Sequence, residues 1–131
     1  MILLRALSFD DAPHVVDSWF AMHAMDDDIR AEIDVLMGYL RQQPREGWTR
    51  PRYDILRNAD GVGEVRFRVR RIEHRALGYF GPNRNDFTFL YFCTKTNRYE
   101  PKNAIEIARA RKKIVAADTK RSLVIKGRWG Q

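Results

Sequence analysis

The sequence predicts an α+β fold in which two N-terminal helices pack on a twisted antiparallel sheet of three to four strands, followed by a C-terminal helix. Two patterns indicate this. Apolar residues recur at helical spacing before residue 43 and again over 104–117, whereas residues 64–70 alternate between apolar and charged side chains. We expect a single domain over residues 1–131, with a basic tail at about 118–131.

The N-terminal segment is predicted to hold a strand and a short helix. Residues 2–8 (ILLRALS) are apolar enough for a first strand. Asp10, Asp11 and Pro13 then form a helix start signal, because carboxylates and proline favour the first turn of a helix. The apolar residues at helical spacing after this signal are Val15, Val16, Trp19 and Phe20.

The second helix has the clearest pattern in the chain. It starts at the acidic run 26–28 and should end at Gln43, because the residue before Pro44 disfavours helical geometry. Its apolar face repeats at i, i+4, i+7, i+8 and i+11, through Ile29, Ile33, Leu36, Met37 and Leu40.

Strand patterns begin after a loop at 45–52. Over 64–70, Val65, Phe67 and Val69 alternate with Glu64, Arg66, Arg68 and Arg70, which indicates a strand with one buried face. Return strands are expected at 75–80 and 87–94, around a Gly-Pro-Asn turn. A helix follows over 104–117. The tail has two interpretations, a final strand around 123–125 or a loosely held basic arm.

Composition limits the class of protein. The chain is 44% hydrophobic and 31% charged, which is typical of a globular domain. It shows no secretory signal and no apolar run of the roughly 18 residues that a membrane span needs, so we expect a cytoplasmic protein that does not contact the membrane. Its single cysteine, Cys93, excludes an intramolecular disulfide and is expected to be a buried strand residue.

Charge is divided unevenly along the chain. Residues 1–40 carry two cations and eight acids, whereas residues 41–131 carry 22 cations and nine acids. A strongly basic body attracts polyanions, and it indicates either nucleic acid or an acidic protein as the partner.

Short motifs in the basic part resemble the RelE/ParE superfamily of bacterial toxins, most closely its phage-derived, HigB-type branch. The resemblance covers about half the chain. It is carried by Asp60-Gly61 with Glu64-Val65-Arg66, His74-Arg75 with Gly78-Tyr79-Phe80, Phe92 to Thr96, and Pro101 with Ala108 and Arg111. The family usually has two lysines at the end of the third strand, and in this chain Thr94 stands in place of the first.

The resemblance implies a toxin that inhibits translation by cutting mRNA in the ribosome without a metal ion. In this chemistry a 2′-hydroxyl attacks the adjacent phosphorus. Arg66 and Arg75 are the candidates for stabilising the phosphorane, because a guanidinium stays charged and binds two oxygens. Lys95 is a candidate phosphate ligand or proton acceptor, His74 an alternative acid or base, and Tyr99 a proton donor or a stacking platform for a base.

Other cations are candidate RNA-binding residues, namely Arg68, Arg70, Arg71 and Arg98. Arg68 and Arg70 have an alternative interpretation as part of a solvated, salt-bridged face. The three histidines lack the close spacing of metal ligands, so we expect no metal and no cofactor.

The resemblance also implies partners: a cognate antitoxin, often with a helix-turn-helix domain, together with the ribosome and mRNA. A second interpretation stays open. The same fold could serve as a non-catalytic basic module that binds nucleic acid or, as in the ParE branch, inhibits a topoisomerase.

Overall fold

A computed structural model describes residues 1–10 and 12–131 of the chain. Three α-helices and seven strands lie within these residues. The strands are β1 (Leu3–Leu7), β2 (Tyr53–Ile55), β3 (Gly63–Val69), β4 (Ile72–Phe80), β5 (Asp86–Lys95), β6 (Tyr99–Glu100) and β7 (Ser122–Val124). The helices are α1 (Val15–Met22), α2 (Asp27–Leu40) and α3 (Ala104–Ala117), with short 3-10 turns at Arg45–Gly47 and Thr119–Arg121.

The strands form one mixed sheet in the order β2-β3-β4-β5-β1-β7, and β6 pairs with one end of β5. Neighbours are antiparallel except for β1 and β5, which run parallel. The predicted fold, with two N-terminal helices on an antiparallel sheet of three to four strands, is therefore wrong. The strand expected at 2–8 and the possible strand around 123–125 are present as β1 and β7. The prediction gave them no place in the sheet, and it missed that β1 and β7 extend the sheet beyond β5.

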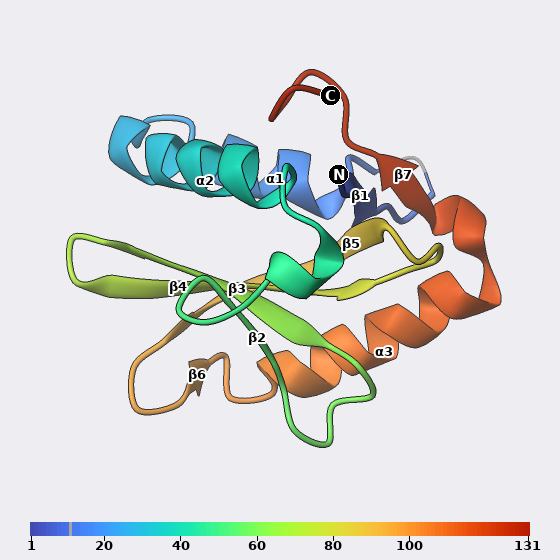
Figure 1. Cartoon of the computed structure of the whole chain (residues 1–131). Helices are drawn as coiled ribbons and strands as arrows, with labels where there is room; N and C mark the ends of the chain where they lie inside the picture. Colours follow the sequence, from blue (N-terminus) through green and yellow to red (C-terminus); the bar gives the residue numbers. More distant parts are fainter. Residues whose placement is uncertain (11) are drawn as a thin grey trace.

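The helices cover both faces of the sheet (Figure 1). Helices α1 and α2 pack on one face against β5 and β3, and α3 packs on the opposite face against β4 and β5. Each interface has its own apolar cluster. The first includes Trp19, Ile33, Met37, Phe87 and Phe89, and the second includes Leu77, Leu90, Ala104, Ala108 and Val115.

The helix predictions are largely confirmed. In α2, Ile29, Ile33, Met37 and Leu40 are buried, and Asp26 caps the first turn by accepting from the Ile29 N–H at 3.2 Å. The helix ends at Leu40 rather than Gln43. The α3 bounds, 104–117, agree with the prediction.

The expected start signal of the first helix is different from the one in the structure. Helix α1 begins at Val15, and the imidazole Nδ1 of His14 caps it by accepting from the Asp17 N–H at 3.1 Å. Asp10 precedes the helix, and Asp11 lies outside the described residues.

The tail after α3 contains a strand. β7 pairs with β1, and the side chain of Gln131 then continues the ladder, accepting from the Leu4 N–H at 2.7 Å and donating to the Leu4 carbonyl at 2.9 Å. Trp129 packs between Phe20 and Phe89, with its indole N–H donating to Asp34. The tail therefore joins α1, α2 and the sheet.

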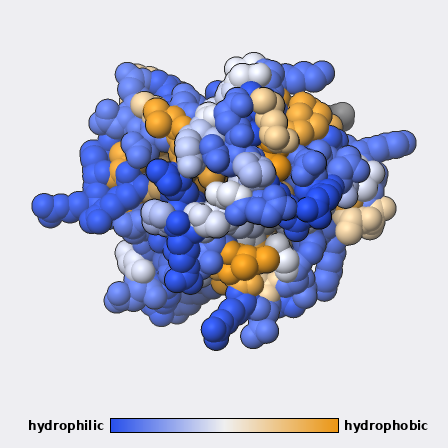
Figure 2. Space-filling model, viewed as in Figure 1, coloured by the Kyte–Doolittle hydropathy of each residue, from blue (hydrophilic) through white to orange (hydrophobic). Residues whose placement is uncertain are grey.

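Hydrophilic residues dominate the face drawn in Figure 2, where hydrophobic areas are small and separate. Across the described residues, no helix combines the length and apolar character needed to cross a membrane.

Candidate functional site

Strand pairing brings the two principal arginines together. Arg66 on β3 lies directly opposite Arg75 on β4, and Arg75 lies opposite Cys93 on β5. Because side chains alternate along a strand, the neighbouring Val65 and Phe67 point to the opposite face, where they join the α1/α2 cluster. The alternation over 64–70 thus places Arg66 and Arg75 on the same face as α3.

A buried carboxylate, Glu64, lies at the centre of this face. Its side chain is 1% exposed. Oε1 accepts hydrogen bonds from the Tyr99 hydroxyl at 2.9 Å and from Arg66 Nη2 at 3.3 Å, and Oε2 lies 2.8 Å from Arg75 Nε. One carboxylate therefore holds a tyrosine and two guanidinium groups, and we call Glu64, Arg66, Arg75 and Tyr99 the Glu64 cluster.

Three buried polar atoms in the Glu64 cluster make no hydrogen bond to the described residues. Arg75 Nε is at ion-pair distance from Glu64 Oε2, but its N–H is not directed at that oxygen. Within residues 1–10 and 12–131, Glu64 Oε2, Arg66 Nε and Arg75 Nε have no hydrogen-bond partner although they are buried. Buried polar atoms nearly always have a partner in folded proteins. Glu64 Oε2 and Arg75 Nε still form an ion pair, so Arg66 Nε is the atom of these three that has no charged partner among the described residues.

Lys95, the last residue of β5, lies next to Tyr99 of the Glu64 cluster. It pairs with Tyr99 across β5 and β6, and its Nζ lies 4.7 Å from the centroid of the Tyr99 ring. Burial raises the pKa of Tyr99, and the charge of Glu64 and its hydrogen bond raise it further. Tyr99 is therefore protonated at neutral pH and able to donate a hydrogen bond.

Two other carboxylates, Asp54 and Glu73, contact the same arginines and are more exposed than Glu64. Asp54 Oδ2 accepts from Arg66 Nη2 at 3.1 Å and from Arg50 Nη2 at 2.9 Å. Glu73 lies 3.4 Å from Arg68 Nε and 3.3 Å from Arg75 Nη1. The cations of this face are thus neutralised in part by the protein's own carboxylates.

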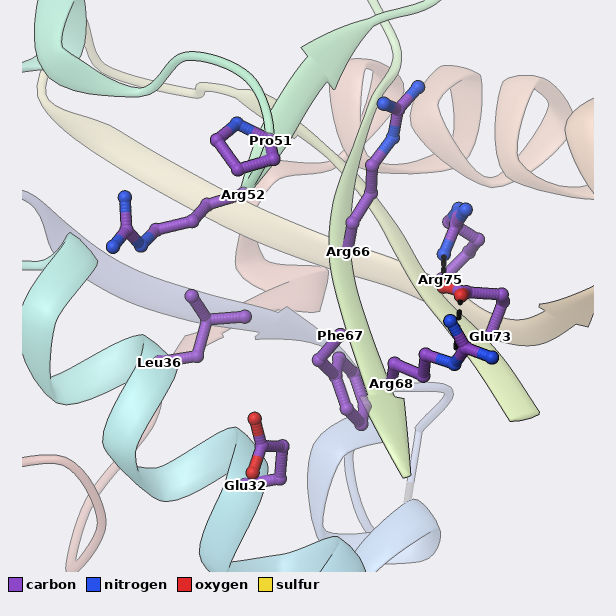
Figure 3. A pocket seen from close by; sticks show the side chains of 9 residues that line it. All are labelled: Glu32, Leu36, Pro51, Arg52, Arg66, Phe67, Arg68, Glu73 and Arg75. Atoms are coloured by element: carbon purple, nitrogen blue, oxygen red, sulfur yellow. Dashed lines mark hydrogen bonds and ion pairs between the residues drawn. The ribbon is translucent and has the colours of Figure 1, made fainter. Parts of the chain in front are cut away.

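An open groove of about 450 Å³ lies beside these residues, where β3 extends past β2. Figure 3 shows Arg68 and Arg75 reaching Glu73, with Arg66 directed away from it. The residues that line the groove are Glu32, Leu36, Pro51, Arg52, Arg66, Phe67, Arg68, Glu73 and Arg75. Four arginines beside an apolar floor suit a single-stranded polyanion.

His74 is not part of the Glu64 cluster. It points to the opposite face, where its ring stacks on Phe67 with centroids 5.0 Å apart and lies 6.4 Å from the ring of His23. Thr94 pairs with His74 and so shares that face. The position at which the family usually has its first lysine is therefore on the other side of the sheet from Glu64.

The predicted RNA-binding arginines are in different environments. Arg70 binds Asp26 and Asp28 at the start of α2, in agreement with its interpretation as part of a salt-bridged face. Arg68 pairs with Glu73, and Arg98 is 3.9 Å from Glu100. Arg71 is exposed in the β3–β4 turn, and none of the described residues forms an ion pair with it.

The sequence interpretation missed the central role of Glu64 and gave no role to Asp54. Glu64 carried a signal, because the alternation over 64–70 places it on the same strand face as Arg66. Asp54 carried none, since β2 is only three residues long and shows no alternation. Among the described residues, no group of three or more His, Cys, Asp or Glu side chains has the proximity of a metal site.

Stability is expected to fall as the pH is lowered from 7.5 to 5.5. Burial lowers the pKa of His14, His23 and His74, so the unfolded chain binds protons more readily than the folded one below about pH 6.5. Urea denaturation at the two pH values measures this. His14→Asn keeps a capping side chain and should reduce the difference, and an unchanged free energy of unfolding across the range would contradict the prediction.

Comparison with known proteins gives one match. The family described as Phage derived protein Gp49-like (DUF891) matches residues 21–113, which is more than half of the chain and includes every residue of the Glu64 cluster. No curated protein and no solved structure matches the chain.

Proposed function

Because the chain belongs to the phage-derived Gp49-like family, a RelE-like toxin family, we propose that it is the toxin of a type II toxin–antitoxin system that cuts mRNA on the ribosome. One observation carries the proposal. Arg66, Arg75 and Tyr99 converge on a single buried carboxylate, and the two arginines also line an open basic groove.

The arginines suit the charge that develops during RNA cleavage. In-line attack by a 2′-oxygen forms a bond to phosphorus, and the resulting phosphorane carries extra negative charge on its oxygens. Arg66 and Arg75 stabilise this charge. Glu64 is a positioning residue for them, because it is buried and contacts both guanidinium groups.

Tyr99 suits the transfer of the 2′-hydroxyl proton. Glu64 is too buried to meet a substrate, but Tyr99 is only half-buried and its hydroxyl donates to Glu64. The hydroxyl accepts the 2′ proton while passing its own proton to Glu64 Oε1. Lys95, next to Tyr99, gives a proton to the leaving 5′-oxygen as the phosphorus–oxygen bond breaks. The products are a 2′,3′-cyclic phosphate and a 5′-hydroxyl. His74 has no role in this scheme.

A free toxin of this kind would arrest its own cell, so the proposal includes a cognate antitoxin with a helix-turn-helix domain. The ribosome supplies the mRNA, and the protein acts in the cytoplasm. The basic charge of residues 41–131 supports a polyanionic target.

Tyr99→Phe should reduce RNA cleavage at least about 100-fold, because it removes only the hydroxyl that transfers the proton. The measurement is induced expression in a bacterial host, with growth, protein synthesis and primer extension on a reporter message. Wild type should give growth arrest and new 5′ ends inside translated codons. Tyr39→Phe is the matched control, since the exposed Tyr39 hydroxyl makes no hydrogen bond to any described residue.

The results separate the alternatives. Full cleavage by a folded Tyr99→Phe variant would exclude the proton transfer through Tyr99. Arrest with intact messages and broken DNA would instead support a topoisomerase inhibitor, and normal growth with a soluble protein would support a non-catalytic binding module.

A further inference from the structure

Two carboxylates contact arginines of the groove next to solvent. Glu73 lines the groove itself, and Asp54 lies just outside it and contacts Arg66, which lines the groove. Side chains of Asp54 and Glu73 are 21% and 36% exposed, in contrast to the 1% of Glu64. The three acids therefore have different surroundings. Glu64 contacts Arg66 and Arg75 from inside the protein, and Asp54 and Glu73 contact them next to solvent.

Each exposed carboxylate bridges two arginines. Asp54 uses the same oxygen, Oδ2, for Arg50 and Arg66, and Glu73 uses its two oxygens for Arg68 and Arg75. Phosphate oxygens accept from the same guanidinium donors as carboxylate oxygens do. Asp54 and Glu73 thus occupy donors that an RNA phosphate would use.

These contacts are weak enough to be exchanged. Partly exposed ion pairs contribute little to stability, because water competes with them and long side chains lose freedom when they pair. The Glu64 contacts are different, since breaking them would leave charges buried. A phosphate can therefore displace Asp54 and Glu73 while Glu64 keeps Arg66 and Arg75 in place.

We propose that Asp54 and Glu73 are internal counter-ions of the groove, which RNA phosphates displace from Arg66 and Arg75, and that they limit how tightly the groove binds RNA. The inference rests on the proposed function and adds the regulation of its substrate affinity. Asp54 stays ionised for this role. Its pKa is lowered mainly by the hydrogen bond from Arg50, and the charge of Arg66 adds to the effect.

The arrangement favours a polymer over a single phosphate. One phosphate that replaces one carboxylate exchanges an anion for an anion and gains little. A single-stranded RNA reaches several arginines along the groove at once and releases its own counter-ions in doing so. The carboxylates therefore select for a chain of phosphates.

The test measures binding of a fluorescent single-stranded RNA whose 2′-O-methyl groups prevent cleavage, by anisotropy at fixed salt. A polyphosphate chain of similar charge serves as a second probe. Asp54→Asn and Glu73→Gln should each bind both probes about three- to tenfold more tightly, since each removes one negative charge beside the arginines.

Glu46→Gln is the matched control. It removes the same charge from the chain, but Glu46 is 69% exposed, and the arginine with which it pairs at 3.0 Å, Arg84, does not line the groove. Its affinity should stay within about twofold of wild type, because exposed charges at a distance are screened. Thermal unfolding of each variant checks that the fold is retained.

Each outcome has a definite meaning. Tighter binding by Asp54→Asn and Glu73→Gln alone supports the inference. Unchanged binding by both, or an equal gain in Glu46→Gln, overturns it and leaves RNA cleavage by the wild type standing. If the variants bind polyphosphate more tightly and RNA is never bound, the inference fails for RNA, and the proposed nuclease function fails with it.

Discussion

Replacing Glu64 with alanine should lower the free energy of unfolding by about 3–5 kcal/mol, because removing one partner leaves the other charges of a buried cluster uncompensated. Arg75 is only 11% exposed, and its Nε contact is with Glu64. Tyr99 would lose the acceptor of its hydroxyl as well. Urea denaturation monitored by circular dichroism measures the change.

Glu64→Gln removes the charge of the side chain but keeps its shape. It keeps an acceptor for Tyr99 but lacks the negative charge that balances Arg66 and Arg75, so its loss of stability should be smaller than that of Glu64→Ala. Glu46→Ala is the exposed control, and we expect a change below about 0.5 kcal/mol. A Glu64→Ala variant as stable as wild type would show that the arginines do not depend on this carboxylate.

Gly78→Ala should destabilise the protein by about 2–3 kcal/mol. Gly78 lies on β4, between β3 and β5, where a Cβ atom would meet the Thr88 carbonyl oxygen at 2.4 Å and ring atoms of Phe87 at 2.7 Å. Backbone and a fully buried ring cannot move aside easily. The same denaturation experiment measures the loss.

Gly38→Ala makes the same chemical change as Gly78→Ala, but it should raise the free energy of unfolding. Gly38 lies inside α2, and its new Cβ would meet no heavy atom within 4 Å. Alanine is the better helix former, so this variant should gain about 0.5–1 kcal/mol. A loss of stability at both positions would show that the methyl contacts at Gly78 are not the cause.

The sequence predicted local elements better than their arrangement. Helical periodicity identified α2 and α3, and alternation identified β3, because both patterns depend on residues close together in the chain. The parallel pairing of β1 with β5 places Leu3 opposite Asp86, and no sequence pattern near either residue predicts this pairing. Strands as short as β2 and β6 have too few residues to alternate.

In the candidate site too, the sequence predicted local features better than the contacts between distant segments. Arg66 and Arg75 were predicted on neighbouring strands, and the register places them directly opposite each other. His74 was separated from them because adjacent residues on a strand face opposite sides, and this follows from the strand once its bounds are known. The position of Asp54 depends on a three-residue strand, which only the folded structure reveals.

The two outermost strands of the main sheet, β2 and β7, have three residues each. A long free sheet edge offers unpaired backbone groups with which strands of other molecules pair. Such short edges leave little template for a second copy, and where β3 extends past β2 the free edge carries arginines that repel a like-charged neighbour. The mixed sheet is thereby protected against edge-to-edge aggregation, and a highly basic chain of this kind should remain dispersed at high concentration.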